Sequence, residues 1–172
     1  MGFSSSVLVG VILTPTILAG ADRVESVCAL LRDAESKHGQ TTRVLGVYHS
    51  DSEGTDLYDP ACRDQLQLRG QAWTSALWLA KPGDPIRIPG SSQPFDDASY
   101  QQLATAVVEA KTKGGSVKAM FEGHFEYCPV FRTVRPGFAK WIGCGHMAAY
   151  PAQIVIQKVS DIGIVAGDPP RR

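Results

Sequence analysis

The sequence predicts a mainly β domain of the α+β class, in which five strands form a small barrel and two helices accompany them. Three observations carry this prediction. Several short segments alternate in polarity, as strands with one buried face do. Two longer segments show the three-to-four-residue apolar spacing of helices instead. Along the chain these elements follow the order helix, strand, strand, strand, helix, strand, strand.

The first helix is predicted over residues 22–38. Asp22 is suited to be its N-cap, because Glu25 follows three positions later as a capping-box partner. Gly39 is a typical stop signal. Cys28 is expected to point inward with the apolar face. That face consists of Val24, Val27, Cys28, Leu30 and Leu31.

A hairpin of two strands is predicted next. Residues 43–49 alternate in polarity, and Gly46 within them marks a bend of the kind found at a barrel corner. Residues 50–55 form a turn cluster. The return strand begins at residues 57–58, and Asp59-Pro60 ends it.

The third strand is predicted over residues 72–80, after an irregular connection at residues 65–70. Residues 81–94 hold four prolines and are expected to form a loop, with a short extended piece at 86–88. The second helix is predicted over residues 95–113, because its apolar residues form a stripe at helical spacing.

Two further strands complete the set, at residues 117–127 and 154–159, with a loop expected over residues 132–145. A helix between the third and fourth strands of a five-stranded barrel is the OB-fold arrangement. The sequence therefore predicts an OB-like barrel with an additional N-terminal helix. The alternative is an α+β sandwich in which the same elements pack as an open sheet.

Four features of this layout resemble a group of uncharacterised exported bacterial proteins. They are a leading helix with a cysteine, here Cys28, and a V-x-G-x-Y strand at residues 44–48. An L-Y-D-P-x-C turn follows at residues 57–62, and G-H-x-x-x-Y stands at residues 145–150. The resemblance implies an OB-like barrel and export, but no known activity.

The first 21 residues predict an export signal. Residues 1–21 carry no charged side chain, and residues 7–18 are mostly apolar. This apolar run is shorter than the about 20 residues that a membrane-spanning helix needs. Ala19-Gly20-Ala21 matches the small-x-small pattern before a signal-peptidase cut. The alternative is a buried strand or a frayed N-terminus in a cytoplasmic protein.

The expected mature chain is a periplasmic or secreted protein without a membrane span. Ala21 stands where a lipoprotein signal requires cysteine, so no lipid anchor is expected. The predicted organisation is a signal peptide at residues 1–21, one domain at residues 22–168 and a tail at residues 169–172.

The four cysteines predict two disulfides in an exported chain, and four cysteines allow three connectivities. The favoured pairs are Cys28–Cys62 and Cys128–Cys144. The alternative is a zinc site, since two imidazoles and two thiolates are a set that zinc binds tetrahedrally. That set would be His124, Cys128, Cys144 and His146.

No catalytic residue is predicted, because the sequence holds no nucleophile elbow, H-E-x-x-H motif or P-loop. Seventeen basic and seventeen acidic residues cancel, which argues against a nucleic-acid partner. The acidic loop around Asp51 lacks the spacing of a calcium-binding EF-hand.

The first functional hypothesis is therefore a non-enzymatic binding or structural domain, without a cofactor and with an unknown partner. The second is a barrel that binds an oligosaccharide or peptide through exposed aromatic residues, and the third is a zinc-binding protein or metal-dependent enzyme. The candidate ligand face for the second hypothesis consists of Tyr48, Tyr58, Phe121, Phe125 and Tyr127. Aromatic residues at alternating positions are usually core residues, which is the competing interpretation.

Overall fold

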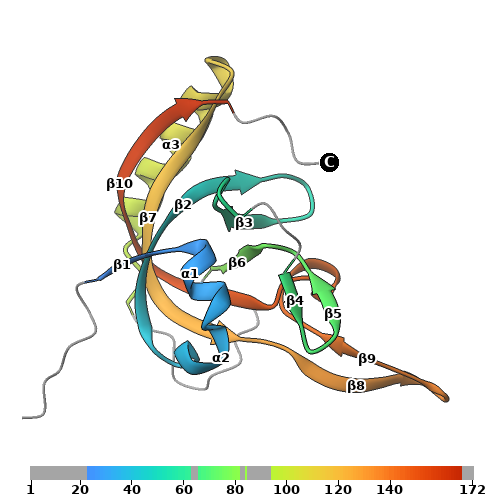
Figure 1. Cartoon of the computed structure of the whole chain (residues 1–172). Coiled ribbons are helices and arrows are strands. Elements are labelled where there is room, and N and C mark those ends of the chain that lie inside the picture. The colour runs from blue at the N-terminus through green and yellow to red at the C-terminus, as the bar shows by residue number, and fades with distance from the viewer. Residues whose placement is uncertain (1–22, 63–65, 82–83, 85–93, 168–172) are drawn as a thin grey trace, which may run out of the picture.

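The computed structural model describes residues 23–62, 66–81, 84 and 94–167 of the chain. Its main sheet has the strand order β1-β2-β3-β6-β10-β7, and β7 also pairs with β2. Five strands therefore close into a barrel (Figure 1). They are β2 (Thr41–Ser50), β3 (Thr55–Tyr58), β6 (Ala76–Ala80), β7 (Gly115–Tyr127) and β10 (Ala152–Ala166). The barrel is mixed, because β6 runs parallel to β10 while the other pairs are antiparallel.

The predicted helix between the third and fourth barrel strands is confirmed as α3 (Asp97–Thr112). It begins after Asp96, whose carboxylate accepts a hydrogen bond from the Ser99 N–H at 3.1 Å. Leu103 and Ala110 are buried on the face that packs against β7 and β10 (Figure 1). The mainly β class and the order of the barrel elements are thus as the sequence predicts.

The N-terminal prediction is wrong in its first turn. Instead of one helix from residue 22, the structure has β1 (Val24–Ser26), α1 (Val27–Arg32) and α2 (Ala34–Lys37). β1 pairs in parallel with β2, which satisfies backbone groups that a helix would satisfy internally. The helix N-cap is Ser26, whose hydroxyl accepts from the Ala29 N–H at 3.2 Å. Residues 1–22 lie outside the described residues.

The expected irregular connection at residues 65–70 is wrong for its described part. β4 (Leu66–Leu68) and β5 (Gln71–Trp73) form an antiparallel hairpin with a tight turn at Arg69-Gly70. The single strand predicted over residues 72–80 is therefore divided into β5 and β6. Most of the loop predicted over residues 81–94 lies outside the described residues.

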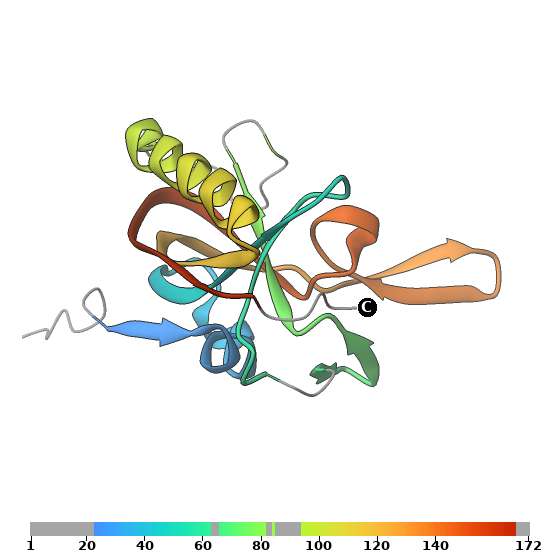
Figure 2. The ribbon, with the colours of Figure 1, turned by 90° about the horizontal axis from the view of Figure 1, so that it is seen from above.

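The loop expected over residues 132–145 is also wrong. β8 (Val130–Arg135) and β9 (Phe138–Ile142) form a hairpin that turns at Pro136-Gly137, where Gly137 has a φ of 76°. Proline followed by a glycine with positive φ is the sequence of a type II turn. We call this hairpin, residues 130–142, the arm. Figures 1 and 2 both show it extending away from the barrel.

The core lies inside the barrel and beneath the helices. Its largest fully buried side chains include Phe121, Phe125, Leu30, Leu57, Leu77, Leu79, Leu103 and Ile154. Among the described residues, no helix is both long and apolar enough to cross a membrane.

Candidate functional site

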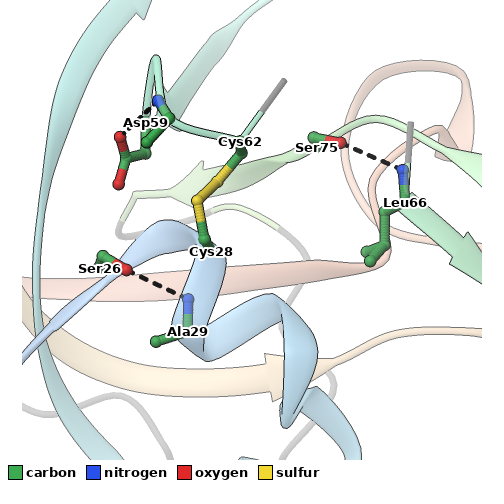
Figure 3. The surroundings of a disulfide bond; sticks show 8 residues. Ser26, Cys28, Ala29, Asp59, Cys62, Leu66 and Ser75 are labelled. Carbon is green, nitrogen blue, oxygen red and sulfur yellow. Dashed lines mark hydrogen bonds between the residues drawn. A yellow bond between two sulfur atoms is a disulfide. The ribbon is translucent and has the colours of Figure 1, made fainter. Parts of the chain in front are cut away.

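The structure contains two disulfides, which join Cys28 to Cys62 and Cys128 to Cys144. The Cα–Cα separation is 5.6 Å in each, within the usual range. The first ties α1 to the segment that follows β3, as Figure 3 shows. The second joins the segments on either side of the arm. Two disulfides indicate an oxidising compartment.

A carboxylate lies close to the first disulfide (Figure 3). The carboxylate of Asp59 and the sulfurs of Cys28 and Cys62 lie within 4.8 Å of one another. Asp59 also accepts a hydrogen bond from the Ala61 N–H at 2.9 Å, which stabilises the turn that presents Cys62. Zinc binds thiolates, so this group is no zinc site while the disulfide is intact.

The alternative zinc set is not assembled in the oxidised chain. The sulfurs of Cys128 and Cys144 are bonded to each other. Within the described part of the chain, His124 and His146 belong to no cluster of ligand atoms within 4.8 Å of one another.

The five aromatic residues predicted as a ligand face do not share an exposed surface. Phe121 and Phe125 have 0% exposure and belong to the core, and Tyr58 is 8% exposed. The half-buried Tyr48 stacks on Phe121, with ring centroids 6.2 Å apart. Tyr127 accepts a hydrogen bond from Arg69 Nε at 3.2 Å. At least Phe121 and Phe125 therefore cannot contact a ligand.

A polar contact joins the β2–β3 hairpin to the segment just before β10. The hydroxyl of Tyr150 donates a hydrogen bond to Asp56 Oδ2 at 3.1 Å. His49 Nδ1 lies 3.2 Å from the same oxygen. His49 Nε2 is 3.8 Å from Asp51 Oδ2. Among the described residues, both ring nitrogens of His49 therefore face carboxylates. Within that part of the chain, neither nitrogen faces a hydroxyl or thiol that the histidine could activate as a nucleophile.

The turn of this hairpin and the segment before β10 also meet over Trp78. A Cβ at Gly54 would lie 1.9 Å from the Trp78 ring, and one at Gly145 would lie 2.5 Å from it. Only glycine permits either approach. Tyr150 also packs on this ring, with centroids 5.3 Å apart. The β2–β3 hairpin and the segment before β10 are thus held together by close packing and a hydrogen bond, which is the chemistry of a structural contact.

Three of the five tyrosines should ionise at unusually high pH. Burial raises the pKa of Tyr48 to about 12. Burial also raises the pKa of Tyr100, and burial together with the charge of Asp56 raises the pKa of Tyr150. Because these phenols hold their protons more tightly when folded, their contribution to stability is complete below about pH 10. It is lost as the pH rises through the folded-state pKa of about 12 of Tyr48.

An absorbance titration of phenolate formation checks this expectation. Asp56→Asn should shift the Tyr150 ionisation to lower pH, since the carboxylate that disfavours the phenolate is gone. Tyr150→Phe identifies that residue's part of the curve. Glu122→Gln, which removes a half-exposed carboxylate elsewhere, serves as the control. An unchanged curve in Asp56→Asn would contradict the assignment.

The arm is a structured element and not a loose loop. Phe131 lies opposite Trp141, and their rings pack with centroids 5.3 Å apart. Arg69 places its guanidinium carbon 4.7 Å from the centre of the Trp141 ring. Gln71 Nε2 donates to the Trp141 carbonyl at 3.3 Å. The β4–β5 hairpin therefore braces the arm where it leaves the barrel.

The surface of the arm is both apolar and basic. Phe131, Val134 and Phe138 are 58%, 54% and 45% exposed. The basic residues are Arg132, Arg135 and Lys140, and residues 128–151 contain no aspartate or glutamate. The sequence pattern does not predict this site, because an exposed hairpin has no buried face to impose regular periodicity. The signal that could have found it is Pro136-Gly137 between two β-prone segments.

Comparisons with known proteins find no matching family model, no matching curated protein and no matching solved structure. The fold and the disulfides define the chain as a disulfide-bonded domain built on a small, mixed β-barrel. The resemblance to exported bacterial proteins stays a prediction.

Proposed function

We propose that this chain is an exported, non-enzymatic binding domain with an OB-type barrel, and that the arm contacts its partner. The strand order supports the fold assignment. The barrel runs β2-β3-β6-β10-β7 and returns to β2, with α3 between β6 and β7. A five-stranded barrel with Greek-key connections is the OB arrangement.

The position of the arm is the observation that carries the binding proposal. OB-type barrels bind their ligands with the loops between strands one and two and between strands four and five. In this chain the second of these loops contains the arm. An exposed hairpin with packed aromatic rings and a disulfide beside it is pre-organised, which lowers the entropic cost of binding.

Export is supported by two independent features. Disulfides persist in oxidising compartments, and the structure contains two. Residues 1–21 have the apolar segment and small-x-small ending of a signal peptide. The non-enzymatic assignment rests on the missing catalytic motifs and on the carboxylate contacts of His49.

Photo-crosslinking in the cells that make the protein tests the proposal. Benzoylphenylalanine at position 131 or 134 should form an adduct with the partner. The same group at Val108, an α3 residue that is 66% exposed, is the control and should form none. Absence of adducts from both arm positions, or equal adducts at Val108, would contradict binding through the arm.

A further inference from the structure

We propose that the partner of the arm is the surface of an anionic lipid bilayer. This inference rests on the proposed function, since it names what the arm binds. It follows from how apolar and basic side chains are placed on the hairpin.

Exposed apolar side chains are concentrated on the arm. The described residues include eight large hydrophobic side chains that are exposed, and four of them lie on this hairpin. A fifth, Met147 at 81% exposure, lies in the short helix η1 (His146–Ala148) that follows it. Single exposed apolar residues are ordinary, whereas a gathered patch marks an interaction surface. The four arm residues are Val130, Phe131, Val134 and Phe138.

Positive charge is concentrated on the same hairpin. The whole chain is neutral, so the three basic residues of the arm are balanced by an acidic excess in the rest of the sequence. Arg132 lies directly opposite Lys140, a like-charged cross-strand pair that is unfavourable by itself. Among the described residues, neither side chain forms an ion pair, and Arg135 instead lies 5.6 Å from the Phe138 ring centre. An anionic surface would relieve this repulsion.

The order of the two kinds of side chain along the arm suits a bilayer interface. Val134, Arg135 and Phe138 lie beside the turn at the tip, while Arg132 and Lys140 lie two residues behind Val134 and Phe138. Two residues of strand span roughly 6.6 Å. Apolar groups of interfacial segments enter the headgroup region by roughly 5–10 Å. The tip can therefore reach the acyl boundary while Arg132 and Lys140 remain at the level of the phosphates. Arg135 lies at the tip itself, and its long side chain can extend back toward the phosphates.

The composition of the arm argues against an oligosaccharide or a nucleic acid as its partner. Residues 130–142 contain no asparagine, glutamine, aspartate or glutamate to bond sugar hydroxyls, and Thr133 is their one neutral polar side chain. Aromatic rings that stack nucleotide bases need open faces. The ring of Trp141 already packs against Phe131 and Arg69. Exposed valines contribute nothing to either kind of recognition, but they do contribute to insertion into lipid.

Vesicle co-sedimentation with the full, oxidised chain tests the inference. The protein should bind vesicles of phosphatidylcholine mixed with phosphatidylglycerol and should bind pure phosphatidylcholine far less. Added salt should weaken binding. Equal binding to both lipids, or none, would overturn the inference.

Variants of the arm locate the effect. R132Q/R135Q/K140Q should weaken binding to anionic vesicles about 100-fold, since each interfacial basic residue contributes roughly fivefold. R23Q/K111Q/K118Q makes the same charge change at exposed positions away from the arm and should leave binding unchanged. V134S/F138S should weaken binding at least tenfold, and V24S/V108S should not. Equal losses in an arm variant and its control would overturn the proposal.

Two further results separate this inference from the proposed function. The bilayer assignment would be overturned if the chain does not bind vesicles but binds a single-stranded oligonucleotide tightly through the arm. It would also be overturned if the chain does not bind vesicles but forms a dimer that only arm variants disrupt. A photo-adduct with a protein in the absence of vesicle binding would overturn it too, although binding through the arm would then still hold. Absence of any arm adduct and of vesicle binding would overturn both.

Discussion

Replacing Cys28 and Cys62 with alanine is expected to lower the free energy of unfolding by roughly 3–4 kcal/mol. The disulfide closes a segment of 34 residues, and opening it restores conformational entropy to the unfolded chain. The folded chain also loses a tether for α1, which contributes Val27, Leu30 and Leu31 to the core. Domains are typically stable by about 5–15 kcal/mol, so this loss is a large share.

Denaturant unfolding measures the loss, and the single variants provide the control. Cys28→Ala and Cys62→Ala each remove the same bond, so each should cost nearly as much as the double variant. Cys128→Ala/Cys144→Ala opens a shorter segment of 16 residues and should cost roughly 3 kcal/mol. Single-variant losses that add up to the double-variant loss would show that side-chain packing, and not the crosslink, is responsible.

The sequence predicts the barrel well because local patterns determine its elements. β2 and β7 alternate in polarity, and their predicted bounds agree with the observed ones to within a few residues, as do those of α3 with its acidic cap. The favoured cysteine pairs are predicted from the elements beside them, and both are present in the structure. The pairing of β2 with β7, which closes the barrel, is expected only by analogy with the OB-fold, since no local sequence signal specifies which distant strands pair.

The elements that were missed depend on contacts that the local sequence does not show. β1 forms because the edge of β2 is available to residues 24–26, although their spacing also fits a helix. The arm forms at a proline-glycine turn and buries little of its surface, so its side chains carry no regular apolar alternation. The β4–β5 hairpin is similarly short. In each case tertiary or turn geometry overrides the periodic pattern.

The misplaced ligand face has a related cause. Alternation correctly places Phe121 and Phe125 on one side of β7, but it does not state whether that side faces the interior or solvent. In a closed barrel the interior side is filled by side chains. Both rings are accordingly buried, and the exposed aromatic surface lies on the arm.

Phe121→Ala should therefore act on stability and not on binding. Its ring is fully buried and stacks against Tyr48 with an interplanar angle of 11°. Replacing a buried phenylalanine with alanine typically costs about 3–5 kcal/mol, because it leaves a cavity as well as removing apolar burial. A loss of this size would leave the domain marginally stable, and growth at lower temperature would favour recovery of the folded chain.

The same substitution at Phe131 is the matched control. Its ring is 58% exposed, so Phe131→Ala should cost about 1 kcal/mol or less, mainly through the lost packing on Trp141. Thermal or denaturant unfolding of the two variants measures the difference directly. Comparable losses at the two positions would mean that the arm is part of the stable core. A small loss at Phe121 would mean that the ring is not enclosed by the barrel, and the aromatic ligand face would then regain its support.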